Sequence, residues 1–522
     1  MRIRLWTASV AAVAALLAAL AIGPTPARAD GNLQNVNHII ILMQENHSFD
    51  NYFGVLPFVN SSPYHSAKGS GRRRHCPDTD NTCVDGLSCK TKNATLMCTN
   101  SNPGNSGRRV RSFHDPRYCI GPDLDHSWIG SHQEGNLRRP NSMLRSSPNT
   151  GFVKVNAISD APTQAIDHDT MGYYDDTDLP FYYDLATTFA ISDRYFAAVI
   201  GQTFPNRAYF LAGTSFGHLT TSEIITSGGY KPITGTIFDR LDAAGVSWVD
   251  YFSDLPYGAM FASNPANRKP VSTFATDAAA GTLPAVAFID PSALKSQTIN
   301  GHVFETDEHP PNDIRAGQYF VSTVINALRN SPSWNDSVLF LTYDEHGGYY
   351  DHVAPPAAAQ GGALTPDGIA PGQCADLSNP PSSQQPGGGV TCSHSQTIDA
   401  PGLCPAFTPT GPYPSNCATF NQLGFRVPLV AVSPFAKPHY VSHTVGSHTS
   451  FLALLEKRFS LAPLTARDAN ASTLEDLFDF DSAPSLNASI VTAPLPVEPG
   501  DPNCPFTGSP SAAFLDAPIL TD

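Results

Sequence analysis

Short runs of apolar residues alternate with longer amphipathic stretches along much of the chain. Six of these runs have the length of a buried strand: Val36–Met43, Ala186–Ser192, Val246–Tyr251, Pro284–Ile289, Ser337–Thr342 and Val427–Val432. Continuous apolar runs of this length are typical of strands that are covered on both faces, as in a parallel sheet. The pattern therefore predicts an α/β fold with a mostly parallel sheet.

Three segments between these runs have the features of helices. Thr236–Ala244 is followed by Gly245, a common helix stop, and Ile314–Asn330 has apolar residues at helical spacing. A third helix is expected over Thr449–Phe459. Such helices are expected to sandwich the sheet.

Two polar stretches interrupt the alternation. Residues 60–145 are rich in Gly and Ser and contain Arg72-Arg73-Arg74, and residues 354–424 are dominated by Pro, Gly, Ser and Gln. We interpret both as disulfide-pinned surface insertions on a single domain that covers residues 30–522. The basic charge of the first insertion favours an anionic substrate or transient contact with an anionic membrane surface, but a solvated loop explains it equally well.

The first 29 residues have the pattern of a secretory signal peptide. Arg2 and Arg4 precede the apolar run Val10–Ile22, and Ala27-Arg28-Ala29 follows it. The run is too short to span a bilayer, which argues against the alternative of a membrane anchor. We expect cleavage after Ala29 and a secreted or periplasmic protein.

Ten cysteines fit a disulfide framework in an exported protein. They fall into an early group of five, a late group of four and one near the end: Cys76, Cys83, Cys89, Cys98 and Cys119; Cys374, Cys392, Cys404 and Cys417; and Cys504. Because the early group is odd, either one bond leaves it or one thiol is free. The absence of C-x-x-C spacing argues against a structural zinc site.

The length of 522 residues is enough for one large core or two ordinary ones, and 15% charged residues excludes disorder driven by charge. The net charge is −15, and the signal peptide contains arginines but no acid. An acidic protein of this kind is not expected to bind nucleic acid. No segment indicates an obligate protein partner.

Two predicted strands end in pairs of polar residues. The strand in VNHIIILMQENHSFDNYFG (36–54) runs into Glu45 and Asn46, and the strand in SVLFLTYDEHGGYYDHV (337–353) runs into Asp344 and Glu345. Open α/β sheets bind their ligands at the carboxyl ends of the strands. We therefore expect these four side chains to meet at one edge of the sheet.

Three carboxylates brought together repel one another unless a cation or protons intervene. The four oxygen-bearing side chains predict one bound divalent metal ion, of unknown identity. A single strand-end carboxylate is more often a helix cap or a solvated loop residue. The occurrence of two such pairs at two strand ends favours the metal site.

The segment GQTFPNR (201–207) places Thr203 just before Phe204-Pro205, a pattern typical of the start of a helix. A helix N-terminus favours an alkoxide or a phosphate oxygen, and Arg207 is close enough in sequence to approach the same anion. Taken alone, this segment indicates only a helix cap.

Histidines beside acids are candidates for contacts with a phosphoryl group. His126 follows Asp125, and His309 follows Asp307-Glu308. Histidine can bind a phosphoryl oxygen or donate a proton to a leaving alkoxide. With 17 histidines in the chain, position alone does not select the acid.

A competing hypothesis rests on Gly213-Thr214-Ser215-Phe216-Gly217, which matches the G-x-S-x-G motif of serine esterases. Ser215 would then be the nucleophile. The polar segment 218–222 is a poor helix, and this hypothesis leaves the carboxylate pairs unexplained. A secreted binding protein without catalysis is a third class.

Seven segments in this order resemble the phosphoesterase family that contains bacterial and plant non-specific phospholipases C and bacterial acid phosphatases. They are QENHSFDNYFG (44–54), DHSW (125–128), GQTFPNR (201–207), DEHPPNDIRAGQ (307–318), TYDEHGGYYDHVAPP (342–356), GFRVPLVAVSP (424–434) and HTSFLALLEKRF (448–459). Seven ordered blocks are far more specific than any one of them.

The resemblance implies an alkaline-phosphatase-like α/β fold and a metal-activated hydroxyl nucleophile. Thr203 would be the nucleophile and a further metal ligand beside the four residues named above. His126 and His309 would contact the phosphoryl group or the leaving oxygen. His346 and His352 would lie near the site.

The family's first block usually reads ENRSFDHYFG, whereas this chain has His47 in place of the Arg and Asn51 in place of the His. A titratable side chain thus replaces a permanent cation. The metal pair Glu45-Asn46 is unchanged.

The expected reaction is a two-step phosphoryl transfer through a phosphothreonine intermediate. The methyl group of Thr203 blocks the aldehyde chemistry of sulfatases and so disfavours sulfate esters. We expect a phospholipase C acting on phospholipids, with an acid phosphatase acting on phosphate monoesters as the alternative.

Overall fold

In the computed structural model, most of the chain between Asn32 and Pro496 is described. The described residues are 32–68, 75–93, 95–105, 107–120, 123–136, 148–159, 168–216, 218, 221, 229–232, 234–294, 297–358, 420–490 and 492–496. The predicted signal peptide and most of the predicted insertion at 354–424 lie outside them.

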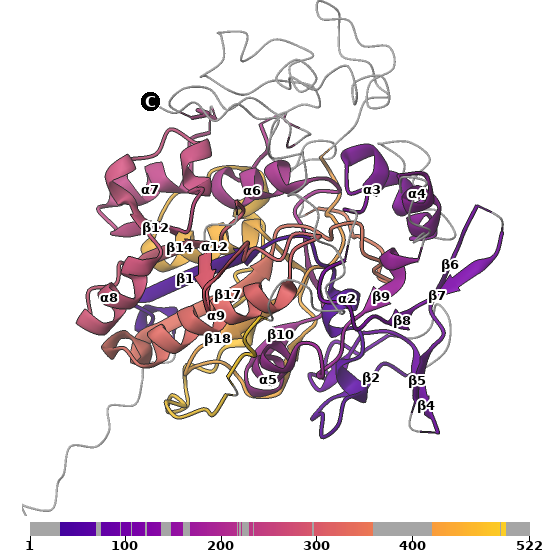
Figure 1. Cartoon of the computed structure of the whole chain (residues 1–522). Helices are drawn as coiled ribbons and strands as arrows, with labels where there is room; N and C mark the ends of the chain where they lie inside the picture. The colour runs from indigo at the N-terminus through magenta and orange to yellow at the C-terminus, as the bar shows by residue number, and fades with distance from the viewer. Residues whose placement is uncertain are drawn as a thin grey trace, which may run out of the picture.

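An eight-stranded sheet runs through the centre of the molecule (Figure 1). Its order is β13 (Arg268–Pro270), β12 (Trp248–Phe252), β14 (Val286–Asp290), β1 (His38–Gln44), β17 (Ser337–Tyr343), β18 (Leu429–Val432), β10 (Ala190–Ser192) and β19 (Tyr440–Ser442). Only the two pairings of β18 are antiparallel. The predicted α/β class with a mostly parallel sheet is confirmed.

Five of the six predicted strands are present within two residues at each end. The sixth, Ala186–Ser192, is wrong over its first half, because helix α5 continues to Thr188 and the strand covers only Ala190–Ser192. Pro180 at the first helical turn starts this helix, and its apolar residues pack against the core as a helix.

The three predicted helices are present. Thr236 caps α7 through a capping box, and Gly245 ends it in the left-handed conformation with φ 66°. The longer helices of the structure are α3 (Trp128–Glu134), α4 (Phe152–Ser159), α5 (Pro180–Thr188), α6 (Thr203–Ala212), α7 (Ile237–Ala244), α8 (Ser272–Ala280), α9 (Ile314–Arg329) and α12 (Thr449–Phe459), and the shorter ones are α2 (Phe49–Phe53) and α13 (Ala466–Ala469).

The helices cover the sheet on two sides (Figure 1). On one face, Phe288 of β14 and Phe340 of β17 pack against phenylalanines of α6, α7 and α12. On the other face, Tyr251 of β12 packs against Phe274 of α8, which contacts α9. Because both faces are covered, all residues of β14 and β17 are buried.

The described part of residues 60–145 forms small two-stranded pairings beside the main sheet (Figure 1). These strands are β2 (His65–Ser66), β3 (Cys83–Val84), β4 (Cys89–Lys92), β5 (Thr95–Cys98), β6 (Ser101–Pro103), β7 (Arg109–Arg111) and β8 (Phe113–His114). Strand β8 pairs with β9 (Gly172–Tyr173), which comes later in the chain. Further short pairings are β11 (Tyr195–Phe196) with β20 (Gly446–Ser447), and β15 (Gln297–Ile299) with β16 (His302–Phe304). That residues 30–522 form a single domain stays a prediction.

Two disulfides, Cys76–Cys83 and Cys89–Cys98, lie within the early group of cysteines. Cys119 is also disulfide-bonded, and neither of these pairs includes it. Of the two alternatives that the odd count allows, the structure therefore favours a bond that leaves the early group.

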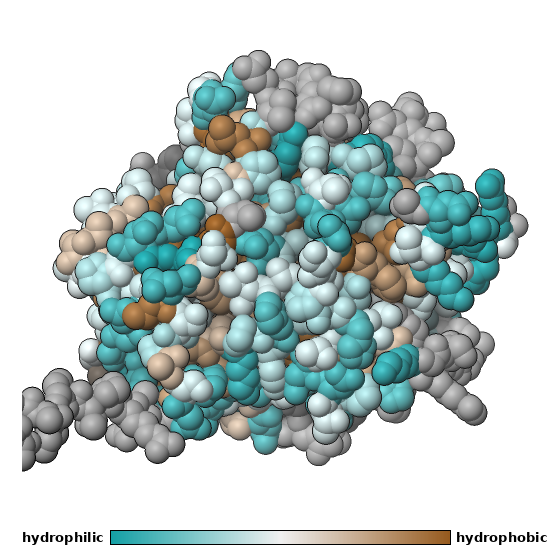
Figure 2. Space-filling model, turned by 90° about the horizontal axis from the view of Figure 1, so that it is seen from below, coloured by the Kyte–Doolittle hydropathy of each residue, from teal (hydrophilic) through white to brown (hydrophobic). Residues whose placement is uncertain are grey.

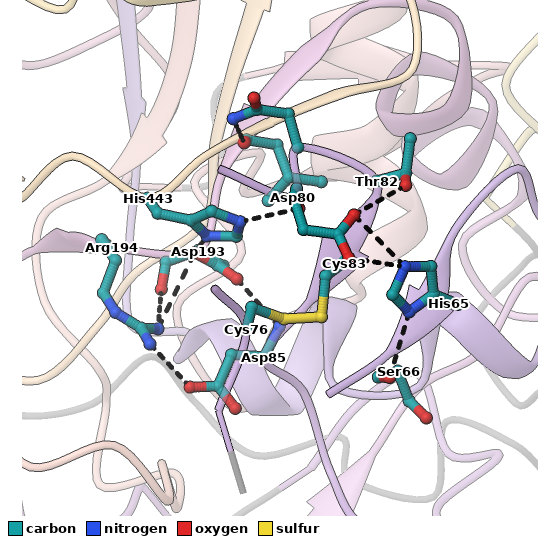
Figure 3. Close-up of a disulfide and its surroundings, with 12 residues drawn as sticks. His65, Ser66, Cys76, Asp80, Thr82, Cys83, Asp85, Asp193, Arg194 and His443 are labelled. Atoms are coloured by element: carbon teal, nitrogen blue, oxygen red, sulfur yellow. Dashed lines mark hydrogen bonds and ion pairs between the residues drawn. A yellow bond between two sulfur atoms is a disulfide. The ribbon is translucent and has the colours of Figure 1, made fainter. Parts of the chain in front are cut away.

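Beside the first disulfide, a chain of largely buried ionic groups joins the segment after β3 to the core (Figure 3). The Nδ1 atom of His443 lies 2.7 Å from Asp193 Oδ1, and the other oxygen of Asp193 accepts the backbone N–H of Asp85. Arg194 donates to Asp85, at 2.8 Å. Residues that are far apart in sequence are held together here by charge as well as by packing.

The surface seen in Figure 2 is mostly polar, with apolar residues in small separate groups. The most exposed large apolar side chains come from separate parts of the chain: Met97, Val303, Val445, Leu486 and Leu495. Among the described residues, no helix is both long enough and apolar enough to cross a bilayer.

Candidate active site

The ends of β1 and β17 lie side by side, as the sequence predicts. Gln44 pairs with Tyr343 in the sheet, so the next residues, Glu45 and Asp344, leave the sheet at the same edge. The Oδ1 atom of Asp344 accepts the backbone N–H of Asn46 at 3.2 Å, which joins the two strand ends directly. All three side chains are fully buried.

Helix α6 brings a cation to these carboxylates. The Nη2 atom of Arg207 donates to Glu45 Oε1 at 3.0 Å, and its Nε atom donates to Asp344 Oδ2 at 3.3 Å. Thr203 is the first residue of α6 and lies one turn before Arg207, on the same helical face. The N-terminus of α6 thus lies one turn away from the arginine that pairs with both carboxylates.

The Thr203 side chain is 3% exposed, and its hydroxyl makes no hydrogen bond to any described residue. The helix begins at Thr203 rather than at the proline two residues later, and Gln202 occupies the cap position. The predicted location of Thr203 at a helix N-terminus is confirmed, and a helix dipole favours negative charge at such a position.

Several buried oxygens at this site have no hydrogen-bond partner among the described residues. They are Glu45 Oε2, Asn46 Oδ1 and Glu345 Oε1. Leaving such atoms unpaired is costly, and binding to a cation is one way to satisfy them. Carboxylate and amide oxygens are ligands for hard divalent cations, so the residues present fit the predicted metal ion.

Arg207 is the one cation that pairs directly with both Glu45 and Asp344 among the described residues. Burial raises the pKa of Asp344, Arg207 lowers it, and the charges of Glu45 and Glu345 raise it again, with the result at about 7. Without a further cation this carboxyl would hold a proton near neutral pH. The electrostatics therefore support cation binding independently of the unpaired oxygens.

His126 and His309 turn one ring nitrogen each toward the same region. Their Nδ1 atoms each lie 2.7 Å from a backbone carbonyl, of Leu124 and of Pro310, which accepts the Nδ1 hydrogen. The Nε2 atom of His126 lies 3.8 Å from Glu345 Oε1. The two rings have centroids 6.0 Å apart, so both are placed to contact one ligand.

Neighbouring carboxylates favour the charged form of both imidazoles. Burial lowers the pKa of His126, but the carboxylates of Glu345 and Asp123 outweigh it and raise the value to about 10. The pKa of His309 is also raised, because Asp123 and Glu45 outweigh the effect of burial. Two imidazolium groups can stabilise phosphoryl oxygens or donate a proton.

His346 lies between two carboxylates. Its Nε2 atom is 2.8 Å from Glu134 Oε2, and its Nδ1 atom is 3.2 Å from Glu345 Oε2. Both nitrogens are therefore occupied, which suits a residue that orients Glu345 rather than one that contacts substrate. The assignment of His346 to catalysis stays a prediction.

His352 has a different set of partners. Its Nδ1 atom lies 2.7 Å from Asp50 Oδ2 and its Nε2 atom lies 3.2 Å from Asp85 Oδ1. Arg426 joins this group by donating to Asp50 Oδ1 at 3.0 Å. The structure thus places His352 in the ionic chain that leads to Asp85, after β3. His352 makes no contact with the candidate ligands described above.

The substitution at His47 has a structural explanation. The ring stacks on Tyr349 and Tyr52, its Nδ1 atom lies 2.7 Å from Asn51 Oδ1, and its Nε2 atom lies 3.1 Å from the carbonyl of Glu308. Burial lowers the pKa of His47 to about 4. This side chain is neutral at physiological pH and supplies no charge to the site.

The adjacent acid Glu308 faces away from the site. Its carboxylate accepts hydrogen bonds from Gln44, Tyr52, Tyr182 and Tyr343. The Nε2 atom of His309, by contrast, has no hydrogen bond to a described residue and lies 3.8 Å from Asp123 Oδ2.

The structure adds four residues that the sequence reasoning did not select. Tyr257 donates a hydrogen bond to Glu45, Asp123 lies 3.8 Å from His309 Nε2, and Glu134 binds His346. The Nε2 atom of His448 lies 2.6 Å from the carbonyl oxygen of Asp344. His448 and Asp123 lie in or beside segments that were recognised, but no pattern in the sequence marks Tyr257 or Glu134.

The structural context of a serine esterase is absent at Ser215. The motif requires a strand before the serine, whereas helix α6 precedes it. The Ser215 side chain is fully buried, and its hydroxyl has no hydrogen-bond partner among the described residues. No group of this kind can act as an accessible nucleophile.

The family model of the Phosphoesterase family matches residues 36–462 of this chain. Non-specific phospholipase C4 of Arabidopsis thaliana is 29% identical over 468 residues, which cover 86% of this chain and 72% of that protein. Phospholipase C B of Mycobacterium tuberculosis is 28% identical over 507 residues, with coverage of 89% and 80%.

Similar solved structures include murine ectonucleotide pyrophosphatase/phosphodiesterase 5, with a TM-score of 0.31, 12% identity, and coverage of 58% of this chain and 95% of that one. Phosphonate monoester hydrolase from Silicibacter pomeroyi has a TM-score of 0.29 and 11% identity, with coverage of 57% and 71%.

Proposed function

Because the chain belongs to the phosphoesterase family and is therefore a hydrolase that acts on phosphoric ester bonds, we propose that it is a metal-dependent phospholipase C. The observation that carries the metal dependence is the set of unpaired buried oxygens of Glu45, Asn46 and Glu345 beside the N-terminus of α6. The relatives, which are named as phospholipases C, support a phospholipid diester as the substrate.

The nucleophile in this proposal is the Thr203 hydroxyl. A bound divalent ion held by Glu45, Asn46, Asp344 and Glu345 would lower the pKa of this hydroxyl. The Thr203 hydroxyl proton passes to water, Oγ1 attacks phosphorus, the bond to the diacylglycerol oxygen breaks, and His126 or His309 donates its proton to that oxygen. The products are diacylglycerol and a phosphothreonine that carries the head group.

Water completes the reaction. The histidine that lost its proton accepts one from the attacking water, the bond from phosphorus to Thr203 Oγ1 breaks, and the phosphorylated head group leaves. The second imidazolium stabilises the equatorial phosphoryl oxygens throughout. Arg207 keeps Glu45 and Asp344 in place, since both of its ion pairs are to these carboxylates.

We also propose that the protein acts outside the cytoplasm, after removal of residues 1–29. The signal pattern in the sequence and the disulfides among the described residues support this location. Contact with a membrane surface would then be transient and made by the folded enzyme.

The test compares a phosphocholine diester, p-nitrophenyl phosphorylcholine, with p-nitrophenyl phosphate, each before and after removal of metal by a chelator. We expect faster turnover of the diester, loss of activity after chelation and recovery when metal is returned. Faster turnover of the monoester would support an acid phosphatase instead. Activity that is indifferent to chelation would contradict the metal site.

Replacing Thr203 by Ala tests the nucleophile. We expect a folded protein that still binds metal but loses at least about a thousandfold in kcat, because the attacking hydroxyl of the proposed mechanism is then missing. Rapid quenching of the wild-type enzyme should trap phosphate on Thr203. A variant that keeps most of its turnover would remove Thr203 from this role.

A further inference from the structure

Each of the three carboxylates at the candidate metal site has one oxygen that is firmly bound by the protein. Glu345 Oε2 accepts the N–H of Gly347 at 2.8 Å and lies 3.2 Å from His346 Nδ1. Asp344 Oδ1 accepts two backbone N–H groups, at 2.7 and 3.2 Å. Glu45 Oε1 accepts from Arg207 and from the hydroxyl of Tyr257.

One oxygen of each carboxylate is thus left for an ion. Glu45 Oε2 and Glu345 Oε1 have no hydrogen bond from any described residue, and Asp344 Oδ2 accepts only from Arg207, at 3.3 Å. Calcium takes six to eight oxygens, from carboxylates that bind through one or both of their oxygens. Smaller divalent ions need fewer ligands and accept single oxygens. The hydrogen bonds around the site therefore disfavour calcium.

Tyr257 is the least expected part of this arrangement. It lies on the 3-10 helix η5 (Tyr257–Met260), which follows β12, and its ring lies 3.6 Å from the guanidinium carbon of Arg207. The Tyr257 ring therefore packs on Arg207, and both residues donate a hydrogen bond to the same oxygen, Glu45 Oε1. With 5% of its surface exposed, Tyr257 is well shielded from water.

The segment that carries Tyr257 is itself fixed by two acids, one within β12 and one at the end of β14. The backbone N–H of Tyr257 donates to Asp290 at 2.7 Å, and that of Gly258 donates to Asp250 at 3.1 Å. A Cβ atom on Gly258 would lie 2.5 Å from that oxygen of Asp250. These contacts leave the tyrosine little freedom to move away from Glu45.

We propose that Tyr257 is a positioning residue that limits Glu45 to a single available oxygen and so makes the site select a small divalent cation over calcium. This inference rests on the proposed metal site but goes beyond it, since it concerns which ion the site accepts. Removing the hydroxyl frees Glu45 Oε1 and lets the carboxylate turn. The preference for small ions then falls.

The experiment titrates the chelator-treated full chain with Mn²⁺ and with Ca²⁺ by calorimetry. In the wild-type protein we expect tighter binding of Mn²⁺. In Tyr257→Phe we expect the ratio of the two dissociation constants to shift by about tenfold toward calcium, a magnitude typical for loss of a partner of a metal ligand. Raising the Mn²⁺ concentration should restore kcat in this variant.

Tyr64→Phe is the matched control. Tyr64 is also 5% exposed, and its hydroxyl donates to the carbonyl of Ala186 at 2.6 Å, away from the candidate ligands. Its loss should leave the ratio unchanged. Gly258→Ala is a second variant that displaces the Tyr257 segment without removing a polar group, and it should shift the ratio in the same direction as Tyr257→Phe.

The inference is overturned if wild-type protein binds calcium as tightly as Mn²⁺, or if Tyr257→Phe keeps the wild-type ratio. An equal shift in Tyr64→Phe would also overturn it, because general loosening would then explain the change. Failure of the proposed function is a separate result. A wild-type chain that binds neither ion has no metal site, whereas a chain that binds Mn²⁺ and hydrolyses the diester still supports the proposed function.

Discussion

The contacts of His346 suit a residue that orients a neighbouring side chain rather than one that touches a substrate. Its two ring nitrogens face Glu134 and Glu345, and the ring packs against Phe425 and Phe152. Burial lowers the pKa of His346, but the two carboxylates raise it to about 9. A cation in this position fixes the orientation of Glu345.

We therefore predict that His346→Gln weakens metal binding by about tenfold and leaves kcat at saturating metal close to that of the wild type. Metal titration and steady-state kinetics measure the two effects separately. His132→Gln is the control, because His132 is buried in the same helix as Glu134 but bonds only the carbonyl of Trp128. A large fall in kcat with unchanged metal affinity would instead indicate contact with the substrate.

At the residue scale, the sequence predicts the strand-end ligands because their chemistry follows directly from their neighbours. Glu45 and Asp344 each come after an apolar run, and parallel strands end at one edge. Tyr257 has no such signal, since its contact with Glu45 depends on how the segment after β12 folds back over α6. His346 and His352 follow the same strand, yet packing sends them to different partners.

At the scale of elements, the site depends on a close approach between the loops after β1 and β17. Gly347 has φ of 60°, and a Cβ atom there would lie 2.1 Å from the carbonyl oxygen of Asn46. Its N–H also holds Glu345. The two loops can meet only because this residue has no side chain.

Gly347→Ala is expected to push the loops apart and abolish tight metal binding. Gly301→Ala is the control, because Gly301 has φ of 86° but nothing lies within 4 Å of the place that its Cβ atom would take. Both variants carry the backbone cost of about 1–2 kcal/mol, and only the first also carries the collision. Thermal unfolding and metal titration of the two proteins check this, and equal metal affinities would contradict it.

Secondary structure was predictable where local signals agree with packing. The capping box at Thr236 and the stop at Gly245 define α7 in sequence and in structure. The failure at Ala186–Ser192 has the opposite cause, because an apolar run that is buried as helix and then as strand has no periodicity to separate the two. The short pairings at 60–145 could not be read from a polar sequence.

At the scale of the whole molecule, buried charges connect distant segments of the chain. His352 lies between Asp50 of α2 and Asp85, which directly follows β3. Burial lowers the pKa of His352, but these two acids raise it from 6.5 to about 9. His352 therefore holds its proton more tightly in the folded protein than in the unfolded chain.

This difference predicts a pH dependence of stability. The contribution of His352 is complete below pH 6.5 and disappears as the pH rises through about 9. We expect the wild type to lose roughly 2 kcal/mol more free energy of unfolding than His352→Gln between pH 6.5 and about pH 9.5. Urea unfolding with the disulfides intact measures both slopes, and identical slopes would exclude this role.

The place of β1 in the sheet determines when the protein can fold. This strand is the first among the described residues, yet both of its neighbours come much later, with Ile39 pairing with Val286 on one side and with Val338 on the other. During synthesis it lacks its first neighbour until β14 has been made, and its second until residue 343 has been released. The apolar strand is without its sheet neighbours for that time, so we expect chains truncated before residue 286 to be prone to aggregation.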